Sequence, residues 1–244
     1  MRKKSSLYSP SIPFFCYCSL MYLLFDADET IWDFHATERI SLKALFDYFH
    51  LPDTKETKDA YEVGNLWCWD AFEKGTITLD ELEELRMKLF FDNLHRPDLD
   101  AKKAADLYAT LLSENGIMLE GAREMLESLS DIPKSLVTNG IAKVQWGRLK
   151  DTDTIKYFDH IFISQEMGVQ KPKKEFFDIV LKTIDKDKDE CIVIGDSEKS
   201  DIQGAINSGI RSIYFSRKGT VSPRATWSVS SYKEMIEVIR TIMA

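Results

Sequence analysis

The sequence has few cysteines, and their spacing does not match a metal site. The 244 residues include Cys16, Cys18, Cys68 and Cys191 and no further cysteine. This spacing fits neither a zinc site nor the disulfide framework of a small secreted domain. We therefore expect reduced thiols and a cytoplasmic protein, because thiols stay reduced in that compartment.

Basic residues are also fewer than acidic residues in this sequence. The chain carries 32 lysines and arginines against 40 aspartates and glutamates, a formal net charge of −8. Nucleic-acid binders usually present a basic face, so this balance argues against a nucleic-acid partner. A small phosphorylated metabolite remains an acceptable partner, because a bound cation can supply local positive charge. The composition leaves open whether the chain forms a homo-oligomer.

No apolar run has the length and flanks of a membrane span. The longest candidate, at residues 12–25, follows the basic start MRKKSS, but a spanning helix needs about 20 apolar residues. A small-x-small cleavage site is missing after it, and cleavage there would remove the strand that carries Asp26. We expect no membrane partner, and we treat residues 1–20 as an N-terminal extension that need not belong to the native fold.

Short apolar runs alternate with helical patterns over most of the chain, without an internal repeat or a long linker. The runs are YLLF (22–25), KSLVT (134–138), HIFIS (160–164), CIVIG (191–195) and RSIYFS (211–216). Helical patterns such as those at 122–130 and 174–184 lie between them. Continuous apolar strands separated by helices predict an α/β fold with a doubly wound parallel sheet covered on both faces. We assign this core to residues 21–33 and 116–244.

Residues 34–115 interrupt the alternation and show no convincing strand. They contain amphipathic stretches at 37–50, 78–94 and 101–112, and Thr78 with Glu81 forms a candidate capping box before the second of these. This pattern predicts a helical cap inserted after the first strand. Such a cap would lie over the carboxyl ends of the strands, where α/β sheets bind ligands.

Chemically useful residues follow four of the predicted strand regions. In chain order they are Asp26 and Asp28, then Thr138, Asn139 and Gly140, then Lys171 and Pro172, and finally Asp196 and Asp201. The carboxyl ends of parallel strands meet at one edge of a sheet, so we expect one site from these segments. Clustered carboxylates become tolerable around a hard divalent cation, and Mg²⁺ prefers oxygen ligands. A hydroxyl, an amide and an ammonium can then hold a phosphate group.

The four segments DADET, VTNG, KP and GDSEKSD, in this order, resemble the four motifs of the haloacid dehalogenase (HAD) superfamily. The resemblance runs from about Met21 to the C-terminus and implies a HAD-like Rossmannoid core. It also implies Mg²⁺ as the cofactor. It further implies that Asp26 is the nucleophile, forms an aspartyl-phosphate and binds Mg²⁺. Asp28 would serve as acid and then base, and would lend its backbone carbonyl to the metal.

The remaining motif residues receive their roles from the same resemblance. Thr138 and Asn139 would bind the phosphate, and Lys171 would steady both the nucleophile and the transferred phosphoryl group. Asp196 would bind Mg²⁺ directly. Asp201 would support the metal site indirectly or through a water molecule. An aspartate at position 28 favours a phosphatase over a dehalogenase, which needs neither that acid nor a metal.

Finer details resemble the pyrimidine 5′-nucleotidase branch of the superfamily. They are LFDADET, VTNG, MGVQKP, GDSEKSDIQGAINSGI and the cap stretch NLWCWDAFEKGTITLDELEELR. Trp67, Trp69 and Phe72 in the cap either stack on a base or form the cap's own core. Arg86 either reaches a substrate or lies on a solvated helix face. Met87 departs from the branch, which tends to have Phe there.

Three functions remain open at this point. The first is a Mg²⁺-dependent phosphatase of nucleoside 5′-monophosphates, that is, a 5′-nucleotidase. The second is a sugar-phosphate phosphatase or a phosphomutase, which shares the chemistry and differs in the substrate or the phosphoryl acceptor. The third is a non-catalytic module that binds a phosphorylated ligand, although intact Asp26, Asp28, Lys171 and Asp196 argue against it.

Overall fold

A parallel sheet of six strands forms the centre of the computed structural model, which describes residues 21–243. The predicted extension at residues 1–20 therefore lies outside the described residues. The strands are β1 (Tyr22–Phe25), β2 (Lys134–Thr138), β3 (His160–Ile163), β4 (Cys191–Gly195), β5 (Arg211–Phe215) and β6 (Trp227–Val229). Their order is β3-β2-β1-β4-β5-β6, and every pair is parallel. The predicted fold class and the five predicted strands are confirmed, and β6 is an addition.

Helices cover both faces of the sheet, as the apolar strands require. Leu23 and Phe25 pack in one cluster with α5 (Ala122–Ser128) and α10 (Tyr232–Met243). Tyr22 and Leu24 point the other way, into a second cluster with α8 (Lys174–Ile184) and α9 (Gln203–Ser208). Neighbouring side chains of a strand face opposite sides of the sheet, so a fully apolar strand buries residues in both layers.

Short helical segments complete the connections between the strands. They are α6 (Ala142–Asp151), α7 (Ser164–Met167), the 3-10 turns η1 (Ile155–Tyr157) and η2 (Lys188–Glu190), and the π-helical turn η3 (Glu198–Ile202). Two of these follow strands that carry predicted site residues: α6 follows β2, and η3 follows β4. They therefore contribute side chains at the same edge of the sheet. In the part of the chain that the structure describes, no helix has the length and apolar character needed to cross a membrane.

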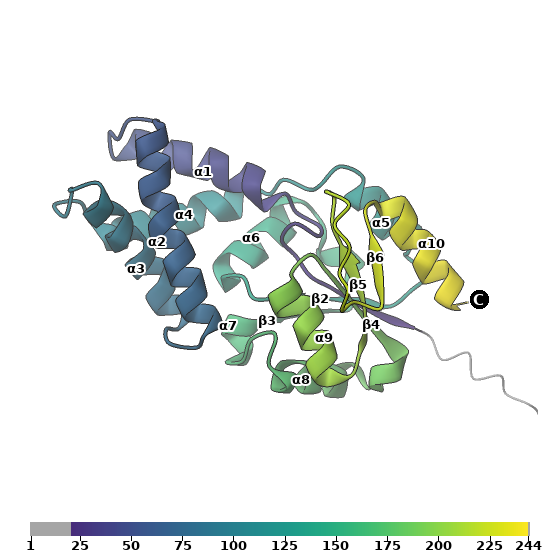
Figure 1. Cartoon of the computed structure of the whole chain (residues 1–244). Helices are drawn as coiled ribbons and strands as arrows, with labels where there is room; N and C mark the ends of the chain where they lie inside the picture. The colour runs from purple at the N-terminus through teal and green to yellow at the C-terminus, as the bar shows by residue number, and fades with distance from the viewer. Residues whose placement is uncertain (1–20, 244) are drawn as a thin grey trace, which may run out of the picture.

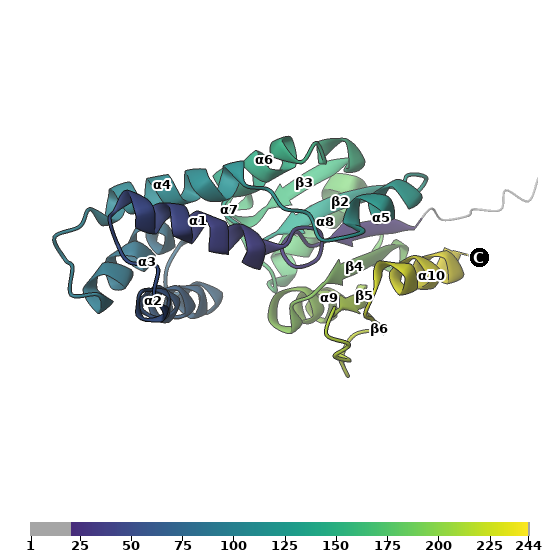
Figure 2. The ribbon, with the colours of Figure 1, turned by 90° about the horizontal axis from the view of Figure 1, so that it is seen from above.

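Four further helices lie between β1 and α5 in the chain. They are α1 (Phe34–Tyr48), α2 (Lys55–Glu73), α3 (Leu79–Asn93) and α4 (Ala101–Glu114). They share a hydrophobic cluster of their own, which also includes Ile141 and Val144 at the start of α6. Figures 1 and 2 show these helices gathered beside the sheet, with β1 running toward them. We infer that they form a cap that rests on α6.

The boundaries of the cap helices follow local sequence signals. Thr78 accepts a hydrogen bond from the backbone N–H of Glu81, and the Glu81 side chain accepts one from the backbone N–H of Thr78, which confirms the predicted capping box. Sequence periodicity did not single out α2, the 19-residue helix that carries Trp67, Trp69 and Phe72. Its buried residues include Thr57 and Gly64 as well as aromatic ones, which weakens its apolar pattern.

Candidate active site

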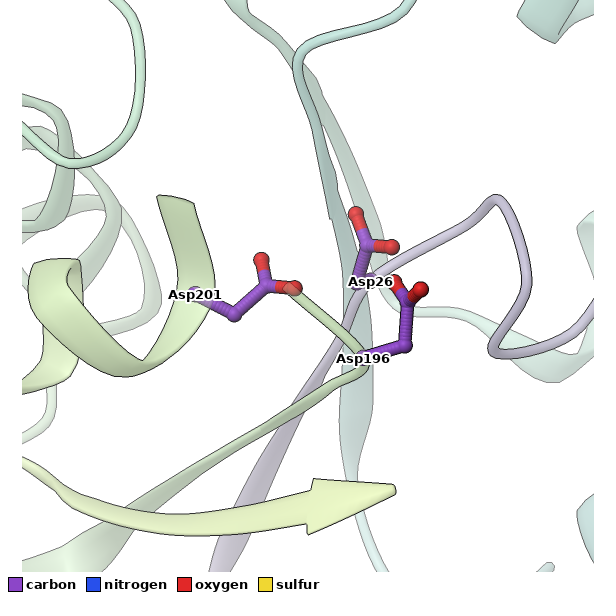
Figure 3. A group of neighbouring side chains, drawn as sticks. All are labelled: Asp26, Asp196 and Asp201. Carbon is purple, nitrogen blue, oxygen red and sulfur yellow. The ribbon is translucent and has the colours of Figure 1, made fainter. Parts of the chain in front are cut away.

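Three carboxylates meet beyond the carboxyl ends of the two central strands. Asp26 follows β1, Asp196 follows β4, and these strands are neighbours in the sheet. Asp201 lies in the turn η3 and points back toward the other two (Figure 3). Each of the three offers a carboxylate oxygen within 4.8 Å of the others. The topology therefore assembles a set of oxygen ligands that no single segment contains.

Lys171 lies among these carboxylates as a buried cation. Its Nζ donates to Oδ1 of Asp26 and to Oδ1 of Asp201, both at 2.6 Å, and to the carbonyl oxygen of Val137 at 2.8 Å. These contacts use all three donors of the ammonium group. Burial alone lowers the pKa of Lys171, but the carboxylates of Asp201 and Asp26 outweigh burial and raise it overall. Lys171 is therefore positively charged at neutral pH.

Asp201 is fixed within the protein rather than exposed to the cavity. Its Oδ1 accepts from Lys171, its Oδ2 accepts from the backbone N–H of Ser197 at 3.0 Å, and the residue is fully buried. A Cβ atom on Gly195 would lie 2.2 Å from Asp201 Oδ2, so this approach requires glycine at position 195. Both oxygens of Asp201 thus accept hydrogen bonds from within the protein.

The carboxylates outnumber the cations that face them. Burial raises the pKa of Asp26 to about 7, the Asp201 carboxylate adds to this rise, and Lys171 opposes it. Burial and the carboxylates of Asp26 and Asp201 likewise raise the pKa of Asp196 to about 8. With Asp28, the site holds four carboxylates against Lys171 and Arg148, which leaves two formal negative charges when all are ionised. The donor set and its charge fit a hard divalent cation such as Mg²⁺.

Asp28 contacts α6 and is not one of the three clustered carboxylates. Its Oδ1 forms an ion pair with Nη1 of Arg148, a fully buried residue, and its Oδ2 accepts from Nε2 of Gln145 at 2.9 Å. Sequence reasoning missed both partners. Gln145 and Arg148 are three residues apart on α6, so they share a helix face. A polar pair at that spacing directly after a candidate phosphate-binding loop was the signal that could have identified them.

The loop after β2 holds Lys171 in place. The side-chain amide of Asn139 makes two hydrogen bonds to the backbone of Lys171, at 2.8 and 2.9 Å. Thr138 Oγ1 accepts from the backbone N–H of Gly140 at 3.0 Å. A Cβ atom on Gly140 would lie 2.0 Å from Nε2 of Gln145, so the glycine makes room for the residue that contacts Asp28. The Asn139 side chain therefore positions the lysine loop, a role that the sequence did not predict.

A cavity of about 250 Å³ lies between these groups and the cap helices. On the side of the sheet it is lined by predicted site residues, namely Asp26, Asp28, Thr138, Asn139, Lys171 and Asp196. On the side of the cap it is lined by Trp69, Phe72, Glu73 and Arg86. Trp67 does not line this cavity and is 55% exposed. Arg86 is 1% exposed, so a solvated helix face is the wrong interpretation of this residue.

Three polar contacts tie the cap to the sheet side of the cavity. Lys199 pairs with Glu73 at 3.1 Å, and Nε2 of Gln170 donates to the carbonyl oxygen of Phe72 at 2.9 Å. Nε2 of Gln165 donates to Asp80 at 2.5 Å. These contacts lie at the end of α2 and the start of α3. They hold the cap over the carboxylates in the conformation that the structure describes.

Glu29, the third acid of the DADET segment, has a structural role outside the carboxylate cluster. Its Oε1 accepts from the backbone N–H of His35 at 3.1 Å, in the first turn of α1, and its Oε2 pairs with Arg217 at 2.5 Å. An acid at a helix N-terminus satisfies a free N–H group and favours the helix dipole.

The amino-acid sequence is similar to the sequences of known hydrolases. The sequence model of the haloacid dehalogenase-like hydrolase family matches residues 23–215 of the chain. The chain is 34% identical over 190 residues to the HAD-hydrolase YfnB of Bacillus subtilis, covering 77% of this chain and 80% of YfnB. It is 32% identical over 224 residues to the pyrimidine 5′-nucleotidase PynA of Streptococcus pneumoniae, covering 89% and 94%. The pyrimidine 5′-nucleotidase YjjG of Escherichia coli is 29% identical, with coverage of 89% and 97%.

A solved structure shares the whole described architecture. The crystal structure of YfnB bound to magnesium has a TM-score of 0.85 and 30% sequence identity, and the match covers 91% of this chain and 99% of that chain. The similarity therefore includes both the sheet and the helices that cover its carboxyl edge.

Proposed function

The chain belongs to the haloacid dehalogenase-like hydrolase family, and from this premise we propose that it hydrolyses nucleoside 5′-monophosphates. The observation that carries the proposal is the pairing of Asp26 with Lys171 at the base of a cavity whose other wall carries cap aromatics. A phosphate at the carboxylates would place its ester group toward those aromatics. The names of PynA and YjjG, pyrimidine 5′-nucleotidases, support this substrate class.

Asp26 acts as the nucleophile in this proposal. An oxygen of its carboxylate attacks the phosphorus atom, the ester oxygen leaves, and an aspartyl-phosphate forms. Lys171 holds Asp26 through Oδ1, which orients the second oxygen of the carboxylate. Water then attacks the phosphorus atom of the intermediate, which releases inorganic phosphate and regenerates Asp26. Thr138 lines the cavity where its hydroxyl can donate to a phosphoryl oxygen, and Lys171 acts on the phosphoryl group through the Asp26 carboxylate that it holds.

Mg²⁺ fits the residues at this site. Asp26 and Asp196 would hold it with their carboxylates, and the backbone carbonyl of Asp28 would assist. Asp201 would contact Lys171 instead of the ion. The bound ion supplies positive charge that offsets the charge of the phosphate and of the carboxylates. The surplus of two formal negative charges supports a divalent ion rather than a monovalent one.

Asp28 moves the protons. As the acid it would protonate the departing 5′-oxygen, and as the base it would then accept a proton from the attacking water. Arg148 and Gln145 bind both of its oxygens and so determine where this carboxyl group lies. The distinct surroundings of Asp26 and Asp28 support their separate roles, since one faces Lys171 and the other faces α6.

Phosphate release from a panel of esters tests this function. We expect release from nucleoside 5′-monophosphates with Mg²⁺, loss of release with EDTA, and loss in Asp26→Asn. The matched control is Asp178→Asn, because Asp178 is exposed on α8 and pairs only with Lys174 in the described residues. Faster release from sugar phosphates would overturn the nucleotide assignment alone. Transfer to a second sugar would indicate a phosphomutase, and binding without release would indicate a non-catalytic module.

A further inference from the structure

Arg86 is a buried cation in the wall of the cavity. It lies on α3 of the cap, is 1% exposed, and lines the same cavity as Asp26 and Lys171. An arginine so completely removed from water normally has a carboxylate partner. Arg86 forms no ion pair with any residue between 21 and 243. Burial opposes the charge of Arg86, but neighbouring acidic groups, including Glu38 and Glu83, keep its pKa raised without forming an ion pair with it. The guanidinium group therefore keeps donors for a group that enters the cavity.

The neighbours of Arg86 hold the guanidinium group without using all of its donors. Nη1 donates to Oδ1 of Asn65 at 3.3 Å, and Cζ lies 4.8 Å from the ring centroid of Tyr108. The hydroxyl of Tyr108 donates to Glu38, so the ring is itself fixed. Nε of Arg86 is buried and has no hydrogen-bond partner among the described residues. No described residue accepts a hydrogen bond from Nη2, so the donors of Nη2 remain for a ligand that enters the cavity.

We propose that Arg86 is the residue that recognises the base of the substrate, by donating to a carbonyl oxygen on the ring of a pyrimidine nucleotide. This inference rests on the proposed function, because the phosphate must be held at Asp26 and Lys171 for the base to reach the cap. Trp69 and Phe72 line the same wall and supply the flat apolar surface on which a base can stack. Arg86 supplies the polar contact that fixes the orientation of the base.

The lining of the cavity favours a base with a carbonyl oxygen over a second phosphate. A second phosphate would require several donors or cations. Among residues 21–243, Arg86 is the one basic residue on the cap side of this cavity, and Arg148 is already paired with Asp28. The pyrimidine bases carry a carbonyl oxygen on the ring, whereas adenine offers ring nitrogens as its only acceptors.

Rates on substrates with and without a base test this proposal. The probes are uridine 5′-monophosphate, adenosine 5′-monophosphate and ribose 5-phosphate, each with Mg²⁺. Losing a hydrogen bond from a charged donor predicts that kcat/KM of Arg86→Met on uridine 5′-monophosphate falls by about 10-fold to 100-fold. The rates on the other two probes should change by less than about 3-fold, since neither carries a base with a ring carbonyl. Equal losses on all three probes, or no loss on any, would overturn the proposal.

A second variant covers the case in which Arg86→Met fails to fold. Asn65→Asp keeps Arg86 and places a carboxylate at the position that now accepts from Nη1. The new charge would compete with the carbonyl of the base, so the preference for uridine 5′-monophosphate over ribose 5-phosphate should fall. Asn65→Ala is the matched control, because it removes the amide and adds no charge. An unchanged preference in Asn65→Asp would overturn the proposal.

Failure of this inference and failure of the proposed function give different results. A wild-type enzyme that cleaves ribose 5-phosphate as well as uridine 5′-monophosphate overturns base recognition and leaves the phosphatase intact. If no ester is cleaved, the proposed function fails and calorimetric binding decides the inference. Tighter binding of uridine 5′-monophosphate than of ribose 5-phosphate, lost in Arg86→Met, supports Arg86. Equal binding of the two overturns it.

Discussion

Nζ of Lys171 lies 2.6 Å from Oδ1 of Asp26, and both side chains are almost completely buried. The same ammonium contacts Asp201 at the same distance. One cation therefore serves two carboxylates from distant parts of the chain. Because low-dielectric surroundings strengthen charge interactions, this arrangement couples the stability of the fold to the charge of the proposed nucleophile.

Removing Lys171 should destabilise the protein as well as inactivate it. Lys171→Met leaves Asp26 and Asp201 as unpaired buried acids, and breaking a buried ion pair costs about 3–5 kcal/mol. We expect that decrease in the free energy of unfolding, measured by urea denaturation, together with loss of phosphate release. Lys199→Met is the control, because Lys199 forms an exposed pair with Glu73, worth about 0–1 kcal/mol. Similar losses in the two variants would contradict the prediction.

The stability of the metal-free protein should fall as the pH rises from about 4 to about 8. The pKa values of Asp26 and Asp196 are raised in the folded state, to about 7 and about 8, from an ordinary value of 3.8. In this window the folded protein holds protons that the unfolded chain has released, so deprotonation favours unfolding. The stabilising effect is fully present below the unfolded-state pKa values and is lost as the pH passes the folded-state values.

Mg²⁺ should reverse that loss, because it binds the ionised carboxylates. The rise in Tm on adding millimolar Mg²⁺ should be larger at about pH 8.5 than at about pH 5.5. Thermal unfolding followed by circular dichroism measures it, and Asp196→Asn should show a much smaller rise. A rise in Tm that is independent of pH, or larger at the lower pH, would argue against a metal at these carboxylates.

Arg148→Gln should impair the cleavage of poor leaving groups most strongly. Without the buried guanidinium, Asp28 loses its charged partner and its fixed position, so proton donation becomes inefficient. General acid catalysis contributes about 100-fold to 10,000-fold, and a misplaced acid should lose at least about 10-fold of this. We expect such a loss in kcat/KM on a nucleoside 5′-monophosphate and a smaller one on p-nitrophenyl phosphate, which needs little protonation.

Arg240→Gln is the matched control for Arg148, because Arg240 lies on the surface and pairs with Asp131. It should leave both rates near those of the wild type. Arg148→Lys should restore part of the rate on the nucleotide, since it restores the charge. Equal losses of Arg148→Gln on both substrates would indicate a general structural role for Arg148 instead.

Gly195→Ala should disturb the site by displacing the side chain of Asp201. The added methyl group would lie 2.2 Å from Oδ2 of Asp201 and would force this carboxylate away from Lys171. Overpacking of this kind costs about 1–3 kcal/mol, so we expect a lower Tm and a lower rate of phosphate release. Asp201→Asn, which keeps the shape and removes the charge, separates the two causes. A variant with wild-type Tm and rate would contradict this account of Gly195.

The strands and the residues at their ends were predictable from the sequence. Each apolar run from YLLF to RSIYFS became a strand, because a strand buried on both faces needs apolar residues at every position. The parallel arrangement then brings the strand ends to one edge, so the meeting of Asp26 with Asp196 followed from local patterns and topology. The three-residue strand β6 was too short to give such a pattern.

The partners of the site residues were decided by the tertiary structure alone. The sequence alone did not identify Arg148 as the partner of Asp28, or show that Arg86 would be buried without an ion pair, because both depend on how α3 and α6 pack. Trp67 and Trp69 are two positions apart on α2, so they face different sides of the helix. Which of them meets the cavity depends on the rotation of α2 against the rest of the cap. Local sequence fixes the period of a helix, but only packing fixes the direction in which each face points.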